Sequence, residues 1–231
     1  MATFVICHGA WDGGWFWKEP ASELQKLGHV VYRPTFTGLG ERKHLGTPNT
    51  NLETHIEDIL NLFEFEQLDH VFLVGHSYGG TVITGVAERI PEKIQRLVYI
   101  DGYVLEDGQS MADLFGDSPL PDQLKTLSEV YGDGWEVPFP SEQRYDSRVS
   151  AQPLQTFLQR LEVKNPQTKQ LPRTYIACTE RGEAPQYGPI AKIAERAKVL
   201  GWQYFELLTG HNPNLTMPRE TGLLLDRVSK G

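Results

Sequence analysis

The chain has 231 residues, 39% of them hydrophobic and 23% charged, which is typical of one soluble globular domain with a sizeable core. Its 30 acidic and 22 basic residues give a net charge of −8 without any basic run, which argues against nucleic-acid and membrane partners. No apolar stretch approaches the length of a membrane span, and residues 1–10 lack the positive region of a secretory signal, so we expect a cytoplasmic protein.

The first two-fifths of the chain alternates short apolar runs with longer amphipathic ones. In chain order these runs predict a strand at Thr3–Cys7, a helix at 17–27, a strand at 30–33, a helix at Leu52–Phe65, a strand at 71–74, a helix at 81–89 and a strand at 97–100. Strands separated by helices indicate right-handed crossovers and a parallel sheet with helices on both faces.

The alternation breaks between about residues 103 and 170, a region rich in Pro, Gly and Asp. We expect an insertion there that roofs the sheet and carries short helices, one of them at 153–163. The pattern then resumes with a strand at 174–178, a helix at 190–200, a strand at 204–208 and a helix at 220–228. Residues 1–231 are therefore predicted to form one α/β domain with a mostly parallel sheet of about six strands and a small helical cap.

Five loops follow predicted strands, and in a parallel sheet such loops meet at one edge, where ligands bind. They are 8–11, 75–80, 101–103, 179–183 and 210–212. We expect the functional site at this edge, beneath the insertion.

A G-x-S-x-G motif at 75–79 lies between a predicted strand and a predicted helix, which is the context of the nucleophile elbow of α/β-hydrolases. Such a sharp turn strains the serine backbone, needs glycine at its flanks and lifts the hydroxyl clear of the sheet, above a helix N-terminus that favours negative charge. We therefore predict the α/β-hydrolase fold with Ser77 as nucleophile. The alternatives are a glycine-rich turn with an incidental serine, and a phosphate loop, which the absence of a Walker lysine excludes.

A serine hydroxyl needs a base, and in this fold the histidine follows the nucleophile and the acid along the chain. His211 is the only histidine after Ser77, so it is the predicted base. We expect His76 to point into the structure and His8 to brace the loop after the first strand. The other four histidines are expected on the surface or in loops: His29, His44, His55 and His70.

Acyl transfer places negative charge on the carbonyl oxygen, which backbone N–H groups can stabilise. We predict that one donor is Tyr78, the residue after the nucleophile, and that the other is Ala10 in the loop after the first strand. Neither a disulfide nor a metal site is expected at Cys7 and Cys178, because both fall inside predicted strands as small buried residues.

These motifs resemble the plant methyl esterase and hydroxynitrile lyase family and its small bacterial esterase relatives. The resemblance is carried by His8-Gly9-Ala10-Trp11 with the following Gly13-Gly14-Trp15 and Trp17, and by the segments 34–42, 75–80, 101–110 and 210–211. It covers most of the chain and weakens across about 115–170. It implies a compact single domain and cofactor-free hydrolysis of small carboxylic esters, often methyl or aromatic ones.

The family's usual acid lies two residues past the threonine of a Cys-Thr pair on the late strand. Cys178-Thr179 is present here, but the acid position is Arg181. An arginine cannot orient a neutral imidazole or stabilise an imidazolium, so a carboxylate at another position would have to take that role.

Asp101, at the end of the strand after the nucleophile helix, is the predicted acid, because some α/β-hydrolases, including haloalkane dehalogenases, take their acid from that strand end. Glu183 and Glu180, which flank the vacated position, remain alternatives, as does a site without an acid, and Asp101 could instead only brace its turn. We expect Asp101 to orient His211 and Arg181 to pair with a nearby carboxylate.

Ester hydrolysis is the predicted reaction, with a small-molecule ester as partner; a homodimer is left open. A hydroxynitrile lyase is less favoured, because the threonine and lysine of that relative correspond to Ala10 and Asn212. A non-catalytic ligand receptor of the same fold would account for Arg181. Six aromatic residues are candidates for an apolar pocket: Trp11, Trp15, Trp17, Tyr103, Phe115 and Trp135.

Overall fold

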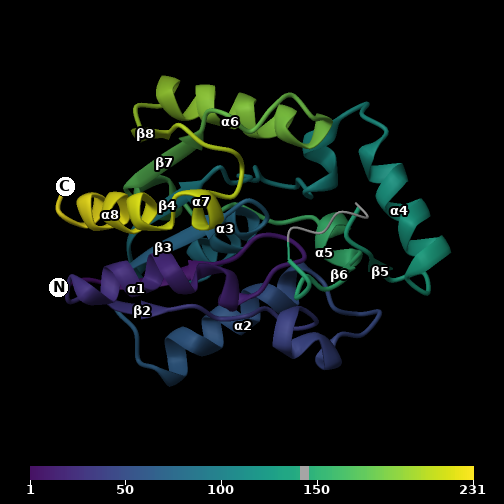
Figure 1. The fold of residues 1–231 in the computed structure, drawn as a ribbon, viewed down its shortest axis with the longest axis horizontal. Helices are drawn as coiled ribbons and strands as arrows, with labels where there is room; N and C mark the ends of the chain where they lie inside the picture. Colours follow the sequence, from purple (N-terminus) through teal and green to yellow (C-terminus); the bar gives the residue numbers. More distant parts are fainter. Residues whose placement is uncertain (141–145) are drawn as a thin grey trace.

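The computed structural model describes residues 1–140 and 146–231, so 141–145 of the predicted insertion lie outside the described residues. The central sheet consists of β1 (Thr3–Cys7), β2 (Val30–Tyr32), β3 (Val71–His76), β4 (Ile94–Ile100), β7 (Arg173–Cys178) and β8 (Gln203–Leu207). The strand order is β2-β1-β3-β4-β7-β8, and every neighbouring pair is parallel (Figure 1). The predicted α/β class and its six strands are confirmed.

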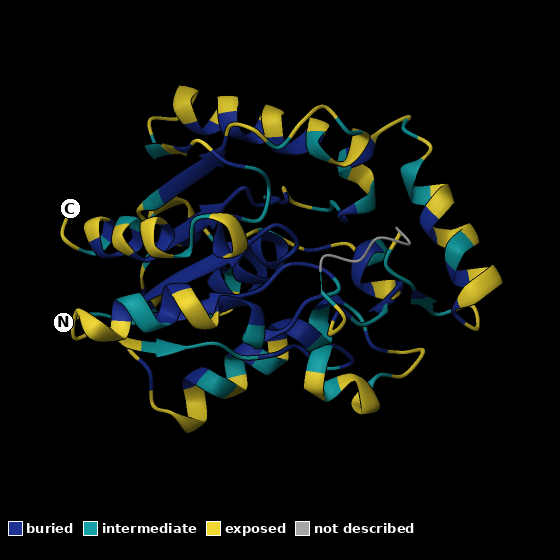
Figure 2. Ribbon diagram, in the orientation of Figure 1, coloured by how far each residue is buried: buried dark blue, intermediate teal, exposed yellow. Residues whose placement is uncertain are grey.

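Helices cover both faces of this sheet. On one face lie α1 (Lys18–Lys26) and α8 (Pro218–Ser229), and on the other lie α2 (Leu52–Phe65), α3 (Gly79–Arg89) and α6 (Gly188–Val199). Successive strand residues point to opposite faces, so Phe4 and Ile6 of β1 pack toward α1 and α8, whereas Val5 and Cys7 pack toward α2 and α3. In Figure 2 the central strands are buried, and the exposed residues lie on the outer sides of the helices.

The helix boundaries follow local signals in the sequence. α2 has the predicted bounds, because Asn51 accepts a hydrogen bond from the Thr54 N–H and the Thr54 hydroxyl accepts one from the Asn51 N–H. The other predicted βα helices each overlap an observed helix. Among the helices of the described residues, none combines the length and the apolar character that a membrane crossing requires.

The segment between β4 and β7 lies at the end of the molecule opposite both chain termini (Figure 1). It contains α4 (Leu120–Tyr131), the two-residue strands β5 (Glu136–Val137) and β6 (Gln152–Pro153), and α5 (Gln155–Leu158). β5 and β6 form a separate antiparallel pair. This segment is the one part of the described fold that is not assembled from βα units.

The prediction of a helix at 153–163 is wrong in extent, because α5 covers only Gln155–Leu158. Gln159 is extended, and Leu161 pairs with Gln109 in an antiparallel bridge, so the following residues bond to another loop instead of continuing the helix. α4 was not predicted, although Leu120, Leu124 and Leu127 recur at helical spacing.

The topology places the site between β1 and β3. β1 lies between β2 and β3, so the chain passes from β1 to β2 on one side and then to β3 on the other side of β1. This reversal of direction opens a crevice at the carboxyl ends of β1 and β3. The strand ends are in register there: Cys7 pairs with Gly75, and His76 pairs with Ile100. The residues that follow these strands therefore lie side by side.

Candidate active site

The chain makes a tight left-handed turn between β3 and α3, with Ser77 at its centre. Ser77 has a φ of +51°, a conformation that costs a non-glycine residue free energy and persists where its surroundings fix it. A Cβ on Gly75 would lie 2.6 Å from the Gly79 carbonyl oxygen, and a Cβ on Gly79 would lie 2.4 Å from the Cys7 carbonyl oxygen. Glycine is therefore required at both flanks, for the steric reason anticipated from the motif.

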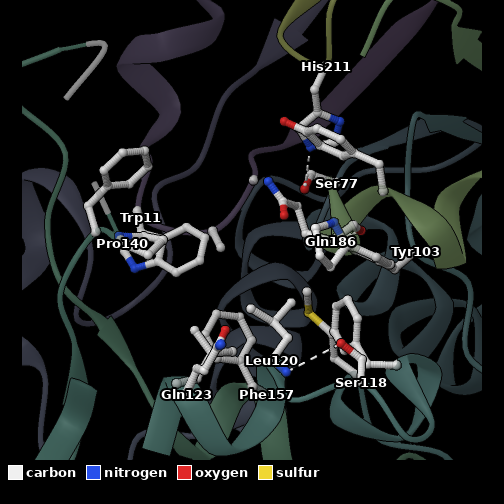
Figure 3. Close-up of a pocket in the computed structure, with 18 of the residues that line it drawn as sticks. Trp11, Ser77, Tyr103, Ser118, Leu120, Gln123, Pro140, Phe157, Gln186 and His211 are labelled. Atoms are coloured by element: carbon white, nitrogen blue, oxygen red, sulfur yellow. Dashed lines mark hydrogen bonds between the residues drawn. The ribbon is translucent and has the colours of Figure 1, made fainter. Parts of the chain in front are cut away.

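Three predicted site residues meet at this turn. Ser77 Oγ lies 2.9 Å from His211 Nε2 (Figure 3). His211 Nδ1 lies 2.7 Å from Asp101 Oδ2. An ionised carboxylate only accepts, so Nδ1 carries the proton and the Nε2 lone pair accepts from the serine hydroxyl. In this tautomer the imidazole can take the proton of Ser77 as the hydroxyl attacks.

Asp101 is the first residue after β4 and its side chain is fully buried. Its Oδ1 accepts from the Cys178 backbone N–H and from Arg181 Nη1, each at 3.1 Å, while Oδ2 faces His211. Arg181 pairs with a nearby carboxylate as expected, but that carboxylate is the predicted acid itself. The carboxylates of Glu180 and Glu183 are exposed and make no hydrogen bond or ion pair within the described residues.

The Ser77–Tyr78 peptide is anchored by its carbonyl group. The Ser77 oxygen accepts hydrogen bonds from the backbone N–H groups of Gly80 and Tyr103, both at 3.0 Å. In a planar trans peptide the N–H points away from its carbonyl, so the Tyr78 N–H is directed away from these anchors. Within the described residues this N–H donates to no acceptor.

The Gly9–Ala10 peptide is anchored in the same way by a side chain. The Phe36 N–H donates to His8 Nε2, so His8 Nδ1 carries the proton and donates to the Gly9 carbonyl oxygen at 2.7 Å. The Ala10 N–H on the other side of this peptide finds no acceptor in the described part of the chain. A Cβ on Gly9 would lie 3.4 Å from Ser77 Cβ, so this loop is close to the turn.

Three buried histidines surround the turn without being its base. Burial lowers the pKa of His8 and His76 to about 3 and that of His55 to about 4, so each is neutral near neutral pH. His76 Nε2 donates to the His211 carbonyl oxygen, and the Tyr78 hydroxyl donates to His55 Nδ1. The expectations that His76 points inward and that His8 braces its loop are confirmed.

The expectation of a surface or loop position is wrong for His55, which lies in α2 and is 0% exposed, whereas His29 lies in the loop before β2 as expected but is only 8% exposed. Both ring nitrogens of each have partners: His29 binds the Ala2 N–H and Asp226, and His55 binds Tyr78 and the Thr37 carbonyl. A histidine with both nitrogens satisfied can be buried like an apolar residue. His44 and His70 are exposed, as expected.

A cavity of about 470 Å³ lies over Ser77 and His211. In Figure 3 these two residues lie on the side of the cavity opposite Leu120, Ser118 and Gln123. Of the six predicted aromatic residues, Trp11, Tyr103 and Phe115 line the cavity, whereas Trp15, Trp17 and Trp135 do not. The prediction missed three aromatic and three aliphatic lining residues: Phe139, Phe157, Tyr187, Met111, Leu120 and Leu124.

Cys7 and Cys178 end β1 and β7, and both are free and buried. Burial raises the pKa of both thiols, which keeps them protonated. Both cysteines are small buried residues of the core strands, as the sequence predicts.

The chain is similar to known proteins in sequence and in structure. The model of the alpha/beta hydrolase family matches residues 4–221. A carbendazim hydrolyzing esterase from Nocardioides sp. (strain SG-4G) is 37% identical over 236 residues, covering 95% of this chain and 96% of that protein. Putative methylesterase 15 from Arabidopsis thaliana is 32% identical over 117 residues, covering 50% of this chain and 26% of that protein.

Among solved structures, an extracellular alpha/beta-hydrolase from a Paenibacillus species matches with a TM-score of 0.82 and 27% identity, covering 98% of both chains. That protein is described as sharing structural and functional homology with tobacco Salicylic Acid Binding Protein 2. The similarity spans the sheet, the turn at Ser77 and the segment between β4 and β7, because it covers nearly the whole length of each chain.

Proposed function

The chain belongs to the alpha/beta hydrolase family, and we propose that it is a serine carboxylesterase that cleaves small methyl or aromatic esters through an acyl-enzyme. The esterase relative with 37% identity and the methylesterase similarity both support ester hydrolysis. The observation that carries the proposal is the hydrogen-bonded series from Ser77 Oγ through His211 to Asp101, at 2.9 and 2.7 Å. A nucleophile, a base and an orienting carboxylate are the groups that acyl transfer requires.

In the first half-reaction Ser77 Oγ attacks the ester carbonyl carbon while His211 Nε2 takes the hydroxyl proton. The carbonyl oxygen becomes an oxyanion, and the N–H groups of Ala10 and Tyr78 are free to bind it. Collapse of the tetrahedral intermediate breaks the bond to the alcohol, which leaves with the proton from His211. The products are the free alcohol and an acyl group on Ser77.

In the second half-reaction a water molecule attacks the acyl carbon, and His211 Nε2 takes its proton. The new tetrahedral intermediate expels Ser77 Oγ, which regains a proton from His211, and the carboxylic acid leaves. Asp101 keeps the imidazole in one tautomer and stabilises the imidazolium that forms in both halves. No cofactor or metal takes part in this proposed scheme.

The aromatic and aliphatic lining of the cavity supports an uncharged ester with an apolar group. Ala10 and Asn212 both line the cavity, at the positions where the hydroxynitrile lyase relative has threonine and lysine, so lyase chemistry is not favoured. We also propose one domain over 1–231 with a cap at about 103–170, and a cytoplasmic location, although the similar Paenibacillus hydrolase is described as extracellular.

The test is hydrolysis of a p-nitrophenyl ester series of increasing acyl length by the wild-type protein, Ser77→Ala and Ser118→Ala. Ser118 is the matched control, because it also lines the cavity but, within the described residues, its Oγ accepts only from the Leu120 N–H. Ser77→Ala should lower kcat by at least about a thousandfold, and Ser118→Ala should change it only a few-fold.

A fluorophosphonate probe, read by intact mass, should label the wild-type protein and Ser118→Ala but not Ser77→Ala. An unlabelled, inactive wild-type protein would overturn the esterase proposal in favour of a ligand receptor, and cyanide release from mandelonitrile would favour a lyase.

A further inference from the structure

The two oxygens of the Asp101 carboxylate have different partners. Oδ2 lies 2.7 Å from His211 Nδ1, while Oδ1 lies 3.1 Å from Arg181 Nη1 and 3.1 Å from the Cys178 nitrogen. The Asp101 side chain is fully buried, and those of Arg181 and His211 are 13% and 14% exposed. The buried carboxylate of Asp101 is therefore shared by the permanently charged guanidinium of Arg181 and by the imidazole of His211, which can also take up a positive charge.

The guanidinium is fixed in this position by a second contact. Arg181 Nη1 also donates to the Cys178 carbonyl oxygen, while the Cys178 N–H donates to Asp101 Oδ1. Cys178, the last residue of β7, is therefore hydrogen-bonded to both Asp101 and Arg181. A buried carboxylate without an opposite charge is costly, and Arg181 supplies that charge beside Asp101 when His211 is neutral.

No other charged group lies against the His211 ring within the described residues. The rings of His76 and Tyr187 are 4.9 and 5.0 Å from it, and burial lowers the pKa of His76 to about 3 and raises the pKa of the Tyr187 hydroxyl. Both are therefore neutral over the range in which an imidazole titrates. The buried carboxylate of Asp12 lines the same cavity as His211. Asp101 and Arg181 are the charges joined to the imidazole by hydrogen bonds, Asp101 directly and Arg181 through Asp101.

We propose that Arg181 is a positioning residue that acts through Asp101: it holds the carboxylate toward His211 and disfavours the imidazolium, so that the base stays unprotonated at lower pH. This inference rests on the proposed function of Ser77 and His211. Protonated His211 must share one carboxylate with a guanidinium that never loses its charge. Without Arg181 the Asp101–His211 pair would keep its proton to higher pH.

The experiment measures the pH profile of kcat/KM for a p-nitrophenyl ester, whose acid limb reports the essential base of the free enzyme. Arg181→Met removes the charge and the hydrogen bond, Arg181→Gln retains a donor without the charge, and Arg181→Lys retains the charge. Arg89→Met is the matched control, because Arg89 likewise joins a carboxylate, that of Glu53, to a carbonyl oxygen, that of Gly85, at the far end of α3.

We expect the acid midpoint to move up by about one pH unit in Arg181→Met and Arg181→Gln. Arg181→Lys should restore most of the wild-type position, and Arg89→Met should not move it. The midpoint does not depend on the amount of folded enzyme, so a less stable variant still gives a readable result. Activity regained on return to neutral pH separates protonation of the site from acid unfolding.

The proposal is overturned if the midpoint stays in place in Arg181→Met or Arg181→Gln, or if Arg181→Lys shifts it as far as they do. If Arg181→Met does not fold, Arg181→Gln against Arg181→Lys still decides between charge and packing. If Ser77→Ala is inactive but the acid midpoint of the Arg181 variants does not move, only the role of Arg181 is refuted. If Ser77→Ala remains active, the proposed function itself is refuted.

Discussion

The floor and the roof of the cavity are built in different ways. The floor consists of residues at or after the strand ends, 9–12, 76–77, 101 and 211. The roof consists of the lining residues between 111 and 140 together with Phe157. Of the six non-glycine residues with positive φ in the described chain, three lie at strand ends of the floor: Trp11, Ser77 and Asp101. The roof is carried by short elements and apolar side chains packed on one another.

The floor is constrained by hydrogen bonds, whereas the roof is constrained by packing. In the floor the side-chain polar atoms of Ser77, His211 and Asp101 have defined partners, so moving one of them leaves a buried donor or acceptor unpaired, and the loss is large. In the roof the side chains are held by packing, in which a changed volume is partly absorbed by its neighbours, so the losses are graded. Substitutions in the floor should therefore change kcat by orders of magnitude, and those in the roof should change substrate preference.

The largest effect in the floor after Ser77 is expected at Asp101. Asp101→Asn should lower kcat by about 10⁴, because an amide can present its N–H to His211 and so favour the wrong tautomer. Glu183→Gln is the control, because Glu183 is exposed and makes no ion pair within the described residues. Steady-state kinetics on both variants decide the assignment: near-full turnover in Asp101→Asn would return the acid to Glu183 or Glu180.

The floor could be predicted from the sequence almost residue by residue. Parallel strands place the residues that follow them at one edge, and the G-x-S-x-G spacing allows one backbone path, so Ser77 and His211 follow from order along the chain. The contact between Arg181 and Asp101 could not be predicted, because it depends on the register of β4 and β7, which spacing does not give.

The roof could not be predicted in the same detail. The helix expected at 153–163 ends at Leu158, because pairing of Leu161 with a distant loop overrides local helical preference. Phe139 and Phe157 line the cavity through contacts with Trp11, which is far away in the sequence. Local patterns give the residues of such a region but not the partners that decide its course.

The second largest loss of kcat is expected at His8, which holds the Gly9–Ala10 peptide of the floor in place. His8→Ala removes the donor to the Gly9 carbonyl oxygen, so the Ala10 N–H loses its fixed direction and kcat should fall by roughly 10- to 100-fold. KM should change less than kcat, because the oxyanion develops in the transition state and the tetrahedral intermediate and is absent from the bound ester.

His55→Ala is the matched control for His8→Ala. His55 is also buried, neutral and bonded through both nitrogens, but it binds the Tyr78 side chain and not the peptide of a proposed oxyanion donor. Both variants should lower the midpoint of thermal unfolding, and only His8→Ala should lower kcat strongly. Equal losses of kcat in the two variants would mean that His8 acts through general packing.

The smallest effect is expected in the roof, where Leu120 faces the cavity at the start of α4. Leu120→Ala enlarges the space opposite Ser77, so kcat/KM should fall by up to about tenfold for short acyl esters, with the optimum moving to longer chains. Leu127→Ala, on the same helix but away from the cavity, should leave the chain-length profile unchanged. A Leu120→Ala variant that instead lost kcat uniformly across the ester series would break the distinction between floor and roof, because a packing residue would then be controlling the geometry of the chemical step.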